Sequence, residues 1–268
     1  MKEIGIGELR ELQMQILDYV DAFCRKHDIK YTISGGTLLG AVRHGGYIPW
    51  DDDMDIQMLR SEYIRFLEVW QQQQHPYEFI CVEYGNGMGY PFGKIFNPKT
   101  ITITGKLCRT GVFIDVFPLD FIVDNKDFVL RHRKNLKLNR QRCMLIEQAK
   151  GNVKNLGWKT RLRMFFTKRT VKSCDELARE MNKIAQERNK EEIHPFVFEM
   201  VAGTRCKSPM PSELFEDYTD VAFENRKYMS VSDSHTYLKL TFGDYMVLPP
   251  LSKRISHSFK AFWLEQDN

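Results

Sequence analysis

Apolar and polar positions along the chain predict alternating helices and short strands. Across residues 8–27 apolar side chains recur every three or four positions, at Leu9, Leu12, Ile16, Val20 and Phe23. This spacing is typical of an amphipathic helix that forms part of a core. The apolar run 31–34 then predicts a strand, 37–42 a short helix, 53–57 a second strand and 60–73 a second long helix.

The rest of the chain continues the same mixture. Short apolar runs separated by Gly, Asn and Pro predict strands over 78–83, 90–96, 100–104 and 111–117. Helical spacing predicts helices over 127–148, 158–172 and 173–188, and further short strands are expected at 199–206 and 222–231. Residues 232–235 predict a last helix start capped by Asp or Ser, and Pro249-Pro250 should end the aromatic segment after it.

Candidate chemistry is concentrated in residues 34–57. Gly35 and Gly36 stand between a predicted strand and a predicted helix, with the hydroxyls of Ser34 and Thr37 beside them. Such a junction exposes backbone N–H groups and the positive end of the helix dipole, which together bind anions. A glycine pair alone is more often a simple turn, so the prediction of a phosphate site depends on the neighbouring residues.

Aspartates come soon after the glycines, in the sequence Asp51-Asp52-Asp53-Met54-Asp55. If residues 53–57 form a strand, Asp53 and Asp55 share one face, roughly 7 Å apart. Two such carboxylates repel each other unless a cation lies between them, and Mg²⁺ prefers carboxylate oxygens while leaving positions for substrate phosphates. An isolated acidic cluster is usually a solvated loop, but beside the glycines it predicts a metal-dependent phosphate site.

Three more residues could belong to this site. Alternation in the strand 111–117 places Asp115 between Phe113 and Phe117, where a lone buried carboxylate is costly. The alternative is an edge-strand aspartate that faces water. Lys94 and Arg43 could contact phosphate oxygens, although a strand lysine is more often a surface residue with a buried stem.

Composition predicts where the protein is located. The 268 residues are 43% hydrophobic, include no run of 18 apolar residues, and begin without the apolar region of a signal peptide. Six scattered cysteines without a C-x-x-C pair fit reduced thiols, so a cytoplasmic protein is expected.

Positive charge is concentrated between residues 131 and 172, which contain 14 Lys or Arg and one acid, Glu147. This segment could be a solvated helix over the core, or an interfacial helix on anionic lipid. A third interpretation is a non-catalytic nucleic-acid-binding protein in which Trp158, Phe165 and Phe166 stack on bases. That interpretation leaves the aspartates unexplained, so nucleic acid is not the expected partner.

Three stretches together resemble the LicD family of the nucleotidyltransferase-fold superfamily, to which fukutin and fukutin-related protein are similar. They are SGGTLLGAVRHGGYIPWDDDMDI at 34–56, FIDVFPLD at 113–120, and the segment 237–250 that contains FGDYMVLPP. The resemblance implies an α+β fold, a nucleotidyltransferase-like mixed β-sheet flanked by helices. We expect a catalytic core over 1–124, a basic helical insertion over 125–195, and a C-terminal part, 196–268, that completes the catalytic domain.

The resemblance also implies the roles of the site residues. Asp53, Asp55 and Asp115 would be the catalytic metal ligands for Mg²⁺ or Mn²⁺, Asp115 being either the third ligand or the base that accepts a proton. Ser34, Gly35, Gly36 and Thr37 would hold phosphate oxygens, with Arg43 and Lys94 nearby. Asp244 and His257 are possible members of the site but are expected to be structural.

The reaction implied is phosphoryl transfer with two metal ions, one on the acceptor hydroxyl and one on the leaving group. A phospho-head group, most typically phosphocholine, would pass from a CDP-activated donor to a sugar hydroxyl of a cell-surface glycan such as lipopolysaccharide, and CMP would be released. CDP-ribitol or CDP-glycerol as donor, and nucleotidyl transfer on the same fold, stay open. The acceptor could be lipid-linked and reached at the inner face of the membrane.

Overall fold

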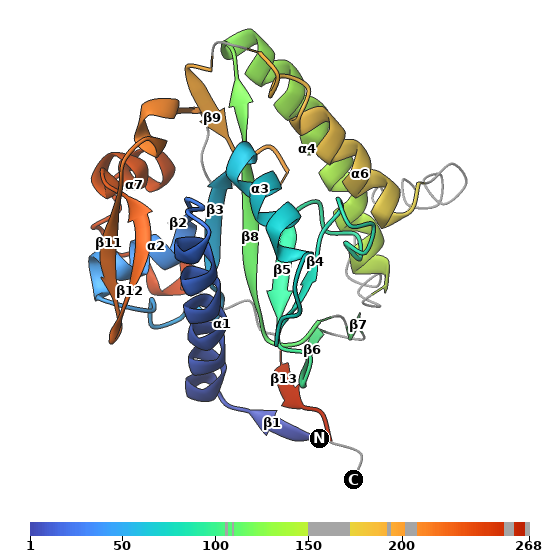
Figure 1. Ribbon diagram of the computed structural model, residues 1–268, viewed down its shortest axis with the longest axis vertical. Coiled ribbons are helices and arrows are strands. Elements are labelled where there is room, and N and C mark those ends of the chain that lie inside the picture. The colour runs from blue at the N-terminus through green and yellow to red at the C-terminus, as the bar shows by residue number, and fades with distance from the viewer. Residues whose placement is uncertain are drawn as a thin grey trace.

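A mixed sheet built around two parallel strands, β3 (Asp55–Leu59) and β8 (Phe113–Ile122), organises the molecule (Figure 1). The computed structural model describes residues 1–104, 107–108, 110–149, 172–191, 194–201, 208–254 and 260–265. The strand order is β10-β9-β8-β3-β2, and β4 joins through β5 to β8. The remaining strands of this sheet are β2 (Thr32–Ile33), β4 (Glu78–Ile80), β5 (Gly93–Phe96), β9 (Phe196–Phe198) and β10 (Met210–Pro211).

The length of β8 explains how one strand serves several neighbours. Its first four residues pair antiparallel with β5, and residues 120–122 pair antiparallel with β9. Its other edge lies against β3 along residues 115–119. Segments distant in sequence therefore meet on β8, and the expected α+β fold with a mixed sheet flanked by helices is confirmed.

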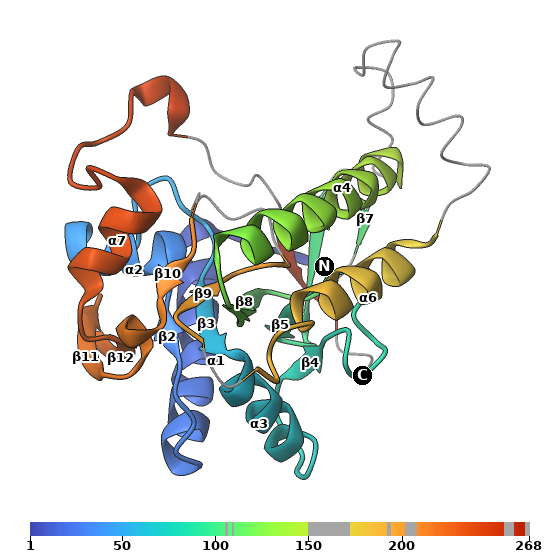
Figure 2. The same ribbon diagram turned by 90° about the horizontal axis from the view of Figure 1, so that it is seen from above.

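Helices cover both faces of the sheet. Figure 2 shows α1 (Ile6–Lys26) and α3 (Arg60–Trp70) on one side and α4 (Asn125–Ala149) on the other. The apolar side chains that recur every three or four residues along α1 are all buried, as the sequence pattern predicted. Helix α6 (Cys174–Ala185) packs along α4 and begins with a capping box at Ser173.

Two smaller sheets complete the architecture. The strands β1 (Lys2–Ile4) and β13 (Lys260–Trp263) pair near the two ends of the chain, and β13 pairs with β6 (Thr100–Thr104), which pairs with β7 (Leu107–Cys108). A hairpin of β11 (Tyr218–Phe223) and β12 (Arg226–Val231) leads to α7 (Ser234–Phe242). Short helices in the described part of the chain are η2 (Ser212–Phe215) and η3 (Leu251–Lys253).

Several predicted boundaries are wrong. The strand β3 begins at Asp55, so Asp53 precedes it and does not share its alternation. The segment 222–231 is not one strand, because Glu224 at φ 52° turns the chain between β11 and β12. Of the strand expected at 199–206, residues 199–201 are not in a strand and follow β9, which ends at Phe198, while residues 202–206 lie outside the described part.

The basic segment is less uniform than its composition. Arg131 is buried, and its guanidinium donates to Asp127 and to the carbonyls of Phe121 and Ala185. Arg142 is buried as well and donates to the Gly89 carbonyl over 3.1 Å. These two cations hold α4 in place, whereas the helix predicted at 158–172, with its aromatic residues, falls outside the described residues except for Lys172.

Composition predicted reduced thiols and no membrane-spanning segment, and the described residues bear on both. Cys24, Cys81, Cys143 and Cys174 are free thiols. No helix in the described part of the chain combines the length and the apolar character needed to span a bilayer.

Candidate active site

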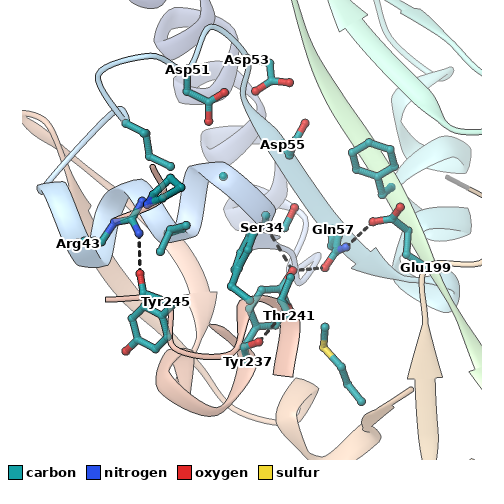
Figure 3. A pocket seen from close by; sticks show the side chains of 18 of the residues that line it. Ser34, Arg43, Asp51, Asp53, Asp55, Gln57, Glu199, Tyr237, Thr241 and Tyr245 are labelled. Atoms are coloured by element: carbon teal, nitrogen blue, oxygen red, sulfur yellow. Dashed lines mark hydrogen bonds between the residues drawn. The ribbon is translucent and has the colours of Figure 1, made fainter. Parts of the chain in front are cut away.

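A cavity of about 600 Å³ opens beside β3, between the start of α2 (Gly35–His44) and α7 (Figure 3). Its walls combine acidic, basic and aromatic side chains. The acidic members are Asp51, Asp53, Asp55, Glu199 and Asp244; the basic ones are Arg43 and Lys253; the aromatic ones are Trp50, Phe117, Phe198, Tyr237, Phe242 and Tyr245. Ser34, Gly35 and Gly36 also line it, so most residues singled out in the sequence meet here.

The two glycines form the first turn of α2 rather than a turn before it. Gly35 has φ +52°, a left-handed backbone that favours glycine. A Cβ on Gly36 would lie 2.5 Å from Oδ2 of Asp51, and one on Gly35 would lie 3.3 Å from Oδ2 of Asp55. A side chain at either position would therefore displace an acidic group of the cavity, and at Gly35 it would also strain the backbone.

The acidic loop before β3 is held by α1. Arg10 donates through Nη2 to the carbonyls of Ile48, Pro49 and Asp51, at 3.1, 3.0 and 2.7 Å. Gln13 donates to the carbonyl of Asp52 over 2.9 Å. These bonds fix a loop in which Asp51 and Asp53 line the cavity while Asp52 is buried. Neither α1 residue was singled out in the sequence.

Asp55 and Asp115 are direct neighbours on parallel strands, paired in register. Neighbouring strands lie about 4.8 Å apart, which brings the two backbones close. Thr37 is buried, and its hydroxyl accepts from the N–H of Asp55 over 2.9 Å. This bond anchors the start of β3 to α2. The N–H of Ser34 donates to the carbonyl of Asp55 over 3.0 Å, a second link between the glycine turn and the acids.

Lys94 lies opposite Asp115 on β5, and its ammonium pairs with the Asp115 carboxylate. Both side chains are nearly buried, and the Lys94 Nζ lies 3.4 Å from the centroid of the Phe113 ring. Among the described residues that line the cavity, neither Lys94 nor Asp115 is included. The structure thus places Asp115 on the strand beside Asp55, with its carboxylate paired to Lys94 on the next strand.

Burial raises the pKa of Asp55, and the charges of Asp53, Asp115, Glu199 and Asp51 raise it further. A divalent cation would relieve this repulsion, and the oxygens of Asp53 and Asp55 are the hard ligands that Mg²⁺ prefers. As the side chains stand, no three His, Cys, Asp or Glu residues in the described part form a ready metal site. The donor set fits such an ion, with Asp115 engaged by Lys94.

A chain of polar contacts that the sequence analysis missed crosses the cavity floor. Gln57, two residues after Asp55, donates to Glu199 over 2.8 Å and accepts from the hydroxyl of Tyr237 over 2.8 Å. That hydroxyl lies 3.4 Å from the N–H of Gly35 (Figure 3). Burial raises the pKa of Glu199 to about 7, with Asp115 adding to the shift. The period of two from Asp55 to Gln57 was the available signal.

Arg43 lies at the far end of α2 and donates to the carbonyl of Tyr245 over 2.6 Å. Burial and the nearby Arg254 lower the pKa of its guanidinium. Asp244 also lines the cavity, as the resemblance allowed, whereas His257 lies outside the described residues.

Comparison with known proteins assigns the chain. A family model described as LicD/FKTN/FKRP, nucleotidyltransferase domain, matches residues 28–150. Lipopolysaccharide cholinephosphotransferase LicD of Haemophilus influenzae is 30% identical, over 98% of this chain and 100% of that protein. The chain belongs to the LicD family. It is an enzyme of the LicD phosphotransferase type.

Other relatives of this LicD family member match smaller parts. An uncharacterised protein of Rickettsia typhi is 31% identical over 147 residues, which is 50% of this chain and 43% of that protein. The ribitol 5-phosphate transferase FKRP of Mus musculus is 47% identical over 38 residues, 14% of this chain and 8% of that protein. Of these three relatives, LicD matches the largest share of this chain.

Proposed function

We propose that this protein is a divalent-metal-dependent phosphotransferase that moves phosphocholine from CDP-choline to a sugar hydroxyl of a cell-surface glycan and releases CMP. The observation that carries the proposal is the wall of the cavity where the start of α2 faces Asp51, Asp53 and Asp55. A helix start attracts phosphate, and carboxylates attract its metal counter-ion. Both would act on the diphosphate of one donor.

In this proposal Asp53 and Asp55 hold Mg²⁺ or Mn²⁺, which neutralises charge on the transferred phosphate. The backbone of Gly35 and Gly36, with the Ser34 hydroxyl, orients the phosphate oxygens at the helix start. Asp115 is bound to Lys94, so it would join as a third ligand by exchanging that ammonium for the ion. Alternatively it keeps Lys94 and accepts the proton of the acceptor hydroxyl.

The lining of the cavity supports a choline head group. Trp50, Phe242 and Tyr245 lie in the same cavity as Asp244 and Glu199. Aromatic faces and carboxylates attract a quaternary ammonium, which cannot donate hydrogen bonds. A ribitol or glycerol head group would instead need hydrogen-bond partners for each hydroxyl. The relative named cholinephosphotransferase agrees with the choline donor, and FKRP keeps the ribitol donor as the alternative.

Arg43 and Lys253 are the cations among the described residues that line the cavity. Both line the cavity, and Arg43 donates to the carbonyl of Tyr245, away from the start of α2 (Figure 3). We assign them to the anionic parts of the donor that the metal does not cover. A lipid-linked or otherwise anionic saccharide acceptor would approach from this side.

The test is CMP release from CDP-choline, CDP-ribitol and CDP-glycerol, each with Mg²⁺ and with EDTA, in the presence of a saccharide acceptor. Metal-dependent CMP from CDP-choline alone supports the proposal. CMP from CDP-ribitol or CDP-glycerol instead assigns the alternative donor. Release of pyrophosphate from a nucleoside triphosphate, without CMP, would show nucleotidyl transfer and refute phosphocholine transfer.

Donor binding measured in the same samples separates two kinds of negative result. Metal-dependent binding of CDP-choline without turnover would mean that the acceptor is of the wrong kind. No binding of any CDP compound by the folded protein would refute the proposal.

A further inference from the structure

An unusually apolar loop borders the active-site cavity. The rim loop, residues 246–253, comes after α7 and exposes Met246, Val247, Leu248 and Leu251, with Leu251 78% exposed and Val247 65% exposed. Val247 and Lys253 also line the cavity, so the loop forms part of its mouth. Large apolar side chains exposed together at this density mark a surface that contacts something other than water.

A basic helix face lies on the same side of the molecule. The basic face is defined by Arg133, Lys134, Lys137 and Arg140 of α4, all exposed at helical spacing, with exposed Val129 and Leu130 one turn earlier. The exposed positions of α4 include no acidic residue. Figure 2 shows α4 and the η3 part of the rim loop projecting from one side of the sheet, opposite α1 and α3.

We propose that the rim loop and the basic face together bind an anionic membrane surface. The cations would lie among the lipid head groups, and the aliphatic tip of the rim loop would enter the interface below them. The mouth of the cavity would then open at the membrane, where a lipid-linked saccharide presents its hydroxyls. Only this last consequence rests on the proposed function, because binding to lipid requires no turnover.

The chemistry of the two surfaces favours lipid over other partners. Base stacking requires aromatic side chains, but none of the exposed residues described on the basic face and the rim loop is aromatic. A symmetric dimer through these surfaces would bring the basic face toward its own copy, where like charges repel. Anionic lipid complements both the charge and the apolar tip.

The experiment is co-sedimentation of the full chain with vesicles of phosphatidylcholine alone and of phosphatidylcholine mixed with phosphatidylglycerol, without any donor. We expect binding to the mixed vesicles that weakens as salt is added. Replacing Arg133, Lys134 and Lys137 with Gln should weaken it about a hundredfold, since each cation near such a surface contributes about fivefold. Removing the same charge at Lys26, Lys99 and Lys227, exposed elsewhere, should leave it unchanged.

The rim loop is tested by Met246→Ser with Leu251→Ser, two residues that do not line the described cavity. We expect this pair to weaken binding on the order of tenfold, with little effect on its salt dependence. Circular dichroism confirms that each variant is folded.

Three results would overturn the proposal. The first is that folded wild-type protein does not bind the mixed vesicles. The second is that the basic-face variant and its charge-matched control lose vesicle binding equally. The third is that the protein binds no vesicles and forms a dimer in solution that the rim-loop variant dissociates. Salt-sensitive binding to single-stranded RNA in place of vesicles would assign the basic face to nucleic acid. A negative CMP assay would leave the vesicle result standing, so the two proposals fail separately.

Discussion

Gly36→Ala tests whether the close approach of Asp51 to the start of α2 matters for activity. The added Cβ would lie 2.5 Å from Oδ2 of Asp51, about 1 Å closer than the 3.4 Å at which ordinary contacts begin. Because that atom ends a short side chain, the carboxylate can move away. The substitution should therefore displace an acidic group of the cavity without disrupting the core.

We expect Gly36→Ala to keep or raise stability and to lower activity. Alanine is the better helix former, so the free energy of unfolding should stay the same or rise by up to about 1 kcal/mol. Displacing an active-site group by about 1 Å should lower kcat/KM for CMP release on the order of a hundredfold. Gly7→Ala is the matched control: it lies in the first turn of α1 with nothing within 4 Å of its Cβ, and should stabilise without loss of activity.

Both quantities are measurable on one preparation, by urea unfolding and by CMP release at saturating Mg²⁺. A folded Gly36→Ala protein with wild-type kcat/KM would refute the reasoning, because Asp51 and the helix start could then move without consequence. A large loss of stability would mean that the contact is structural instead.

The remaining predictions concern the ion site, the core and its pH response. Asp55→Asn should lower CMP release on the order of a thousandfold, with Asp217→Asn as the exposed control, and unchanged activity would remove Asp55 from the site. Asp120→Asn should lower the free energy of urea unfolding by about 2–3 kcal/mol, because buried Arg60 loses the carboxylate that it meets at 2.8 Å and 2.9 Å and keeps Glu83 at 3.0 Å. A loss below about 1 kcal/mol, as for the exposed Lys30–Asp28 pair, would contradict this. The pKa of Glu199 is raised from 4.5 to about 7, so the folded state binds the proton more tightly and the free energy of unfolding falls as pH rises between those values. Glu199→Gln should flatten this decline when urea unfolding is measured at several pH values in EDTA. An unchanged slope would contradict the assignment. Arg10→Met should lower kcat about tenfold by releasing the loop carbonyls that Arg10 binds, and a KM change alone would argue against a role in placing the acids.

The sequence by itself determined the local elements and the residue types of the site. The apolar spacing of α1 and the short apolar runs of β2 and β6 needed only neighbouring residues, so these elements were predicted nearly to their ends. The glycines at the start of α2 and the aspartates that lead into β3 were evident for the same reason, since both lie in one short stretch. Their role as metal and phosphate ligands stays a prediction.

Tertiary structure decided what those residues touch. Lys94 meets Asp115 because β5 pairs with β8, and Glu199 reaches Gln57 because β9 pairs with the far end of the same strand. Composition counted Arg131 with the other cations of α4, although packing against α6 buries it. Periodicity shows only which side of a segment is apolar. Strand pairing and burial depend on the free energy of the whole chain. The partners of a buried charge are therefore set by the fold.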